Sequence, residues 1–227
     1  MLHFTKTLCT SLIAVWLVLF VVSEARADTV VFSNFGPGMS FVTDSGFTVI
    51  ASNVSGVQIP AVAFTPSGDF IFTSAQLGVG SLSGPNLLQV ILMTSSGGAP
   101  GNIIEIITLT NVPAFASGGI ALANSALHPV LTSGTQYWLV AFPPDPDTFM
   151  AWNFSLIDFS SPVLGSFTDL TGPWLSIQGP GGPRPAFQIN GEPIPEPTTM
   201  LLLGTGLAAL GTTVRKRRAM NSRRSRG

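Results

Sequence analysis

The chain has 227 residues, of which 45% are hydrophobic and 9% are charged, and its formal net charge is −1. This length suggests one domain with appendages, and so little charge among so many apolar residues excludes an intrinsically disordered chain. Residues 28–192 contain nine acidic residues but a single base, Arg184, which gives this central part a formal charge of −8. Nucleic-acid binding is excluded as a main function, because it requires clustered Lys and Arg.

The first 27 residues have the pattern of a secretory signal peptide. Lys6 makes the start positive, residues 12–22 form an apolar run of 11 residues, and Ala25 and Ala27 give the small-x-small cleavage pattern. Eleven helical residues span about 16 Å, which is too short for the ~30 Å hydrocarbon core of a membrane. We therefore expect a signal helix that is cleaved after Ala27. Cys9 would leave with it, so the mature chain would have no disulfide and no thiol nucleophile.

Residues 28–190 are predicted to form one extracellular all-β domain. Short runs rich in Val, Ile, Phe and Thr alternate with Gly, Pro, Ser and Asn, and no segment has the periodicity of an amphipathic helix. The expected strands are residues 29–35, 46–50, 61–64, 70–77, 87–94, 103–109, 119–123, 137–142, 149–156, 174–177 and 186–189. Such short strands predict an antiparallel β-sandwich, jelly-roll-like in its connections.

One hairpin can be predicted within this domain. Residues 95–102, Ser-Ser-Gly-Gly-Ala-Pro-Gly-Asn, separate two strongly apolar strands. Because Gly, Pro and Asn favour tight turns, these two strands are expected to pair.

The polar residues of the domain indicate no catalytic site, metal site or cofactor. His128 is the one histidine of the mature chain and precedes Pro129, so it is expected at the surface rather than beside a nucleophile. Asp145 and Asp147 lie in a proline-rich loop, where they could bind Ca²⁺ or form a solvated turn. A pair of carboxylates for glycoside hydrolysis can meet only in space, and no pair is marked in the sequence.

Aromatic residues offer a possible contact for sugars. Tyr137, Trp138, Trp152 and Trp174 lie in or near apolar strands, where aromatic side chains usually belong to the core. Successive side chains of a strand point to opposite faces, so either Tyr137 or Trp138 is expected to face outward, where it could stack on a glycan.

Residues 191–227 form a tail with three parts in order. Pro195, Glu196 and Pro197 come first, the uncharged residues 200–214 follow, and a basic block comes next: Arg215, Lys216, Arg217 and Arg218. The prolines prevent a helix from extending backward. The 15 uncharged residues predict a transmembrane helix about 22 Å long, which is short for a span, with its basic end held in the cytoplasm.

This order of motif, helix and basic block resembles the PEP-CTERM protein-sorting signal of Gram-negative bacteria that produce exopolysaccharide. The resemblance implies recognition of Pro195, Glu196 and Pro197 by exosortase, a membrane-embedded, transpeptidase-like enzyme that cleaves near the motif. It also implies that residues 200–214 hold the precursor transiently in the inner membrane, while the basic block stops translocation. The further residues 219–227 depart from members that end soon after the basic block, and an ordinary C-terminal anchor is the alternative.

The body also resembles a known set of exported bacterial domains. The residues that carry this similarity are Gly98-Ala99-Pro100-Gly101, the run 131–140 and Trp152. They are similar to the choice-of-anchor extracellular modules, the R type in particular, which share a body and carry interchangeable anchoring tails. This resemblance implies export but no particular activity.

The expected function is that of an exported, non-enzymatic protein of the cell envelope or of the exopolysaccharide matrix of a biofilm. Its expected partners are the secretion machinery, exosortase and a weakly bound exopolysaccharide, and its expected location is the cell surface or extracellular matrix. One alternative is a secreted glycan hydrolase, whose cleft would hold two acids within ~5–10 Å. Another is a permanently anchored surface adhesin, which would keep its C-terminal helix.

Overall fold

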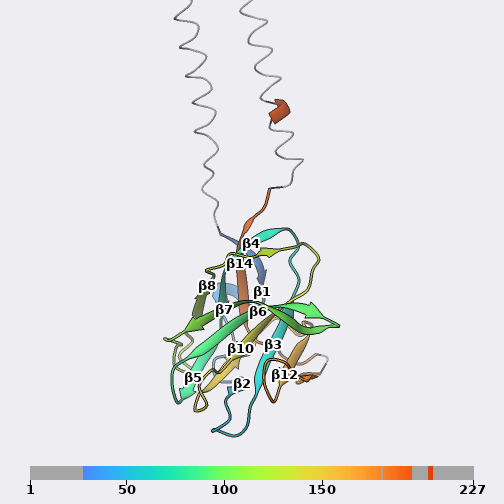
Figure 1. The fold of residues 1–227 in the computed structure, drawn as a ribbon. Coiled ribbons are helices and arrows are strands. Elements are labelled where there is room, and N and C mark those ends of the chain that lie inside the picture. Colours follow the sequence, from blue (N-terminus) through green and yellow to red (C-terminus); the bar gives the residue numbers. More distant parts are fainter. Residues whose placement is uncertain (1–27, 180, 196–203, 207–227) are drawn as a thin grey trace, which may run out of the picture. The chain divides into compact units, whose positions relative to one another are not determined.

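A computed structural model describes residues 28–179, 181–195 and 204–206 (Figure 1). The chain divides into two units, Met1–Glu192 and Pro193–Gly227, and the first contains the β-sheets. The described strands are β1 (Thr29–Ser33), β2 (Gly46–Ile50), β3 (Ile59–Phe64), β4 (Phe70–Leu77), β5 (Val79–Ser83), β6 (Leu88–Ser96), β7 (Ala99–Leu109), β8 (Ala121–Asn124), β9 (Val130–Leu131), β10 (Tyr137–Phe142), β11 (Phe149–Asn153), β12 (Val163–Ser166), β13 (Trp174–Ser176) and β14 (Phe187–Pro193). A 3-10 turn, η1 (Pro37–Met39), follows β1.

The strands form three antiparallel sheets. A six-stranded sheet has the order β13-β12-β3-β10-β6-β7, and a second sheet has the order β1-β14-β4-β8, with β9 also paired to β4. A three-stranded sheet has the order β2-β11-β5. Only Gly78 separates β4 from β5, so the chain passes directly from the second sheet into the three-stranded one. The prediction of an all-β, antiparallel fold is confirmed, while the jelly-roll-like connectivity stays a prediction.

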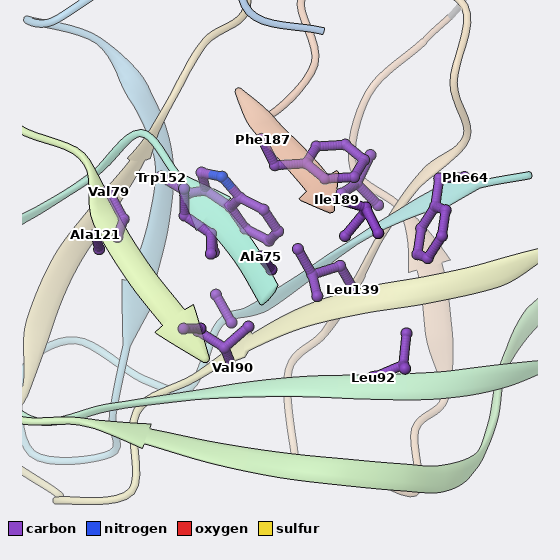
Figure 2. Close-up of a cluster of buried hydrophobic side chains, with 14 of the residues drawn as sticks. Phe64, Ala75, Val79, Val90, Leu92, Ala121, Leu139, Trp152, Phe187 and Ile189 are labelled. Atoms are coloured by element: carbon purple, nitrogen blue, oxygen red, sulfur yellow. The ribbon is translucent and has the colours of Figure 1, made fainter. Parts of the chain in front are cut away.

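The main hydrophobic core lies between these sheets. The six-stranded sheet contributes alternate residues such as Leu92 and Leu139, and the other two sheets contribute residues such as Trp152 and Phe187. Figure 2 shows Phe187 and Ile189 of β14 on the side of the core opposite Leu92. The two-residue period of a strand explains this arrangement, because every second side chain reaches the same face.

The six-stranded sheet is also covered on its other face. Ile59, Ile91 and Trp138 are fully buried there, and Leu170 and Trp174 from the segment after β12 pack against this second cluster. Its three central strands, β3, β10 and β6, are therefore apolar on both faces, as expected of strands with no solvated side.

Most of the predicted strands are present with small shifts at their ends. Residues 46–50, 70–77 and 137–142 are strands with the predicted bounds. The predicted strand 149–156 ends earlier, at Asn153, because Ser155 instead uses its hydroxyl to cap the backbone of Ile157 and Asp158. Three strands were not predicted: β5, β9 and β12. β9 is only two residues long, and β5 and β12 contain Gly and Ser, which weaken the pattern of a strand.

The predicted hairpin is confirmed. Strands β6 and β7 pair from Leu88↔Leu109 to Ser96↔Ala99. The loop is only Gly97-Gly98, with φ angles of 60° and 81°. A two-residue hairpin loop with positive φ at both positions strongly favours glycine. Because the loop is this short, the two strands extend further into residues 95–102 than expected.

The two ends of the body lie side by side in one sheet. Thr29 at the start of β1 is paired with Gly191 near the end of β14, and β14 lies between β1 and β4. Among the described residues, no helix is long and apolar enough to cross a membrane. The predicted signal helix, with Ala25 and Ala27, lies outside the described residues. Of the predicted helix 200–214, only residues 204–206 are described, and they are helical.

Candidate functional site

A pocket of about 460 Å³ opens beside β12 and β13, at one edge of the six-stranded sheet. Its lining combines apolar side chains, Phe159 and Val163, with polar Ser160 and Gln178 and with the single base of the body, Arg184. This volume falls within the range of small-molecule sites, and a mostly apolar lining with a few polar groups is typical of them. The pocket is therefore the candidate binding site of the described body.

The loop that carries Phe159 and Ser160 is fixed by Asp158. Asp158 Oδ1 accepts hydrogen bonds from the backbone N–H groups of Ser160 (2.9 Å) and Ser161 (3.1 Å), and its Oδ2 accepts one from Asn34 (3.1 Å). Burial by itself raises the pKa of Asp158, but the hydrogen bonds from Ser160, Ser161 and Asn34 outweigh it and lower the pKa. The carboxylate is thus held in its charged form as a cap for this loop.

Asn34 connects the same loop to the two ends of the body. Its side-chain amide donates to Pro185 O (2.8 Å) as well as to Asp158, and its Oδ1 accepts from the Phe187 N–H (2.7 Å). The Ser155 hydroxyl donates to the Asn34 carbonyl (2.6 Å). Asn34 is buried, so these bonds replace those it would make with water. They tie the residues after β1 to the loop before β12 and to the start of β14.

Arg184 is buried without a counterion in the described part of the chain. The residue is 4% exposed, and its Nη1 donates to Gly182 O (3.0 Å) and, over longer distances, to Gly179 O and Pro183 O. Nη2 donates to Gly179 O at 3.5 Å, whereas Nε is buried and has no hydrogen-bond partner. An unmade hydrogen bond of a buried donor costs about 1–3 kcal/mol, and the charge adds to this cost.

Glycines supply backbone carbonyl groups that accept hydrogen bonds from the guanidinium. Gly181 has a φ angle of 77°, which favours glycine, and a Cβ on Gly182 would overlap the side chain of Gln178. Arg184 thus donates to carbonyl groups that lie shortly before it in the chain, those of Gly179, Gly182 and Pro183.

The prediction that Tyr137 or Trp138 faces solvent is wrong. The two side chains do point to opposite faces, but Tyr137 is 6% exposed in the main core and Trp138 is fully buried in the second cluster. Strand alternation does place the two side chains on opposite faces of the sheet, but the segment after β12 covers the face that carries Trp138. Trp152 is also fully buried, and Trp174 is half-buried, so sugar stacking on Trp138 or Trp152 is excluded.

The other singled-out polar residues lie apart from the pocket lining. His128 is exposed, and its Nδ1 lies 3.3 Å from Phe72 O. Asp145 Oδ1 accepts the N–H of Asp147 (2.9 Å), and Asp147 Oδ1 accepts from the exposed Asn53 amide (2.9 Å), which is the geometry of a turn. Among the described residues, no group of three or more His, Cys, Asp or Glu side chains is arranged to hold a metal ion.

No motif in the sequence marks the pocket residues. Arg184 stands out only as the lone base of the body, and Phe159, Ser160 and Gln178 belong to no pattern. The available indication was a single arginine that follows a Gly-Pro-rich run in an otherwise acidic domain.

Only the start of the predicted sorting motif is described. Pro195 is half-buried and follows β14 without regular structure. Glu196 and Pro197 lie outside the described residues, as do Arg215, Lys216, Arg217 and Arg218. The roles of these residues stay predictions.

The described body is thus an all-β, sandwich-like module with a pocket at one sheet edge, followed by a proline-containing tail. The family described as PEP-CTERM protein-sorting motif matches residues 193–218. The chain therefore carries this sorting motif, as its tail predicted, and the motif supports exosortase-dependent sorting of an exported protein. It implies export across the inner membrane and a place in the envelope or at the surface. None of the curated proteins compared matches the chain, and the similarity to choice-of-anchor modules stays a prediction.

Proposed function

We propose that the mature protein is a non-enzymatic component of the cell surface or exopolysaccharide matrix and that it binds glycans weakly. The observation that carries this proposal is the sorting motif at residues 193–218. The motif assigns the chain to a route that ends in the envelope or at the surface, where polysaccharide is the abundant neighbour in the matrix of a biofilm.

The buried acidic residues support a structural rather than a catalytic role. Glu105 is 3% exposed and accepts hydrogen bonds from Ser125 (2.7 Å), Ala126 (2.6 Å) and Leu127 (3.0 Å). Asp158 is occupied in the same way by Asn34, Ser160 and Ser161. A general acid or base must be free to exchange a proton with a substrate, and these carboxylates instead hold loops in place.

The sorting route defines the remaining steps of the proposal. The signal before Asp28 takes the chain into the secretion channel, residues 200–214 hold a membrane-anchored precursor, and Arg215–Arg218 stay in the cytoplasm. Exosortase then acts near Pro195, Glu196 and Pro197 and releases the body from the inner membrane. The proposal includes no cofactor, because the mature body is proposed only to reside at the surface or in the matrix and to bind glycans weakly.

Fractionation and a polysaccharide assay together test this function. The protein recovered from its native bacterium is expected in the surface or matrix fraction and is expected to sediment with isolated exopolysaccharide without shortening it. Release of reducing ends would contradict the non-enzymatic role and would favour the hydrolase. Recovery only with the inner membrane would contradict release and would favour an anchored adhesin.

A further inference from the structure

The pocket beside Arg184 contains a charge that the protein itself does not neutralise. Among the described residues, Arg184 donates hydrogen bonds only to backbone carbonyl groups, and no carboxylate forms an ion pair with it. A buried charge is normally paired, and the body contains nine acidic residues that could have supplied a partner. An anionic ligand would supply the missing negative charge.

The unused donors of Arg184 favour a carboxylate. Nη1 and Nη2 both donate to Gly179 O, whereas Nε–H has no acceptor. Nε–H and the second N–H of Nη2 lie on one edge of the planar guanidinium group, and this edge matches the two oxygens of a carboxylate. Arg184 also lines the pocket, which places this unpaired charge beside the space that a ligand would fill.

The rest of the pocket fits a sugar ring. Phe159 lines the pocket and is 45% exposed, so it offers an accessible aromatic surface to the apolar C–H face of a pyranose. The Gln178 amide can donate to and accept from sugar hydroxyl groups. The Ser160 and Ser176 hydroxyls already donate to Asp158 Oδ1 (3.3 Å) and Gln178 O (3.1 Å), so they offer their oxygens as acceptors. The volume of about 460 Å³ suits a small ligand of this class.

We propose that this pocket binds an acidic sugar, with its carboxylate against Arg184 and its ring against Phe159. The inference rests on the glycan contact proposed above and names the class of glycan: an exopolysaccharide that contains uronic acid. The formal charge of −8 on residues 28–192 does not prevent this contact, because charges farther away than about 8 Å are largely screened at physiological salt.

Titration with methyl glycosides tests the proposal on the protein recovered from its native bacterium. Methyl glucuronide and methyl galacturonide are compared with methyl glucoside and methyl galactoside, which lack the carboxylate, by isothermal titration calorimetry. At least one uronide is expected to bind with a Kd of about 1 mM, and the neutral glycosides at least ~10-fold more weakly. Inorganic sulfate is the control for a site that accepts any anion.

Two variants assign the binding to this pocket. Arg184→Gln is expected to weaken uronide binding about 10- to 100-fold, since it removes a charged donor. Phe159→Ala is expected to weaken it about 3- to 10-fold without changing the fold, because Phe159 is on the surface. The matched control is Phe167→Ala, which removes an equally exposed phenylalanine (48%) outside the pocket lining and should leave binding unchanged.

The outcomes separate this inference from the proposed function. If no uronide binds at about 10 mM, or if Phe159→Ala and Phe167→Ala behave alike, the pocket is not an acidic-sugar site. If sulfate binds as well as the uronides, the site recognises anions in general and the inference is wrong. Exopolysaccharide that still sediments with the Arg184→Gln and Phe159→Ala variants would overturn the inference alone. If exopolysaccharide does not sediment even with the unmutated protein, the proposed function is wrong.

Discussion

Replacement of Asn34 by alanine tests whether this residue joins the two ends of the body to the pocket loop. The side chain makes three buried hydrogen bonds, with Asp158 (3.1 Å), Pro185 (2.8 Å) and Phe187 (2.7 Å). Asn34→Ala removes the hydrogen bond to each of the three partners and leaves a small void. Each unsatisfied buried group costs about 1–3 kcal/mol, but neighbouring losses do not add fully, so we expect a total loss of about 3–5 kcal/mol.

Urea denaturation, followed by the fluorescence of the buried tryptophans, measures this loss. For a domain of this size the same change lowers the Tm by roughly 10 °C. The matched control is Asn53→Ala, because the bond from Asn53 to Asp147 (2.9 Å) is exposed and its loss should cost no more than about 0.5 kcal/mol. If Asn34→Ala costs less than about 1 kcal/mol, or no more than the control, the structural role assigned to Asn34 is wrong.

Three further predictions test the packing and the charge of the body. Trp138→Ala should cost about 3–5 kcal/mol of unfolding free energy in urea, because its face of the sheet is covered; a loss below about 1 kcal/mol would show that this face is open. The pKa of Asp158 is lowered in the folded state, so its contribution to stability is present above the unfolded value of about 3.9 and is lost as the pH falls through the lowered pKa. Asp158→Asn should therefore flatten the fall of the urea midpoint between about pH 5 and pH 2, and an unchanged slope would refute this role. Gly84→Ala should be more destabilising than Gly97→Ala by at least about 1 kcal/mol in the same assay: both have positive φ, but only at Gly84 would a Cβ overlap a neighbouring group, the carbonyl of Asp147. Equal losses would contradict the overlap.

The sequence predicted the fold class because strand patterns are local. Alternation and turn residues were sufficient to place strands such as residues 70–77 and 137–142 and the hairpin at Gly97-Gly98. Strands such as β9 and β12 were missed, since they pair mainly because their neighbours provide an edge. Local sequence also could not show that a distant segment covers the face that contains Trp138.

The candidate pocket could not be predicted for the same reason. Its residues come from separate stretches, near 159–164 and 176–184, that carry no shared motif. Asn34 and Asp158, which support it, are 124 positions apart and meet only in the folded chain. The sorting tail could be predicted from the sequence, because its three parts follow one another directly. The family of PEP-CTERM sorting motifs indeed matches residues 193–218.

Intact mass spectrometry tests the central claim, exosortase-dependent sorting, most directly. The protein is recovered from its native bacterium and from the same strain without exosortase. Exosortase-dependent sorting predicts a mature form that begins at Asp28 in both strains and that loses its tail near Pro197 only when exosortase is present. A protein that keeps residues 200–218 in both strains would contradict this sorting and would show that the tail is an ordinary anchor.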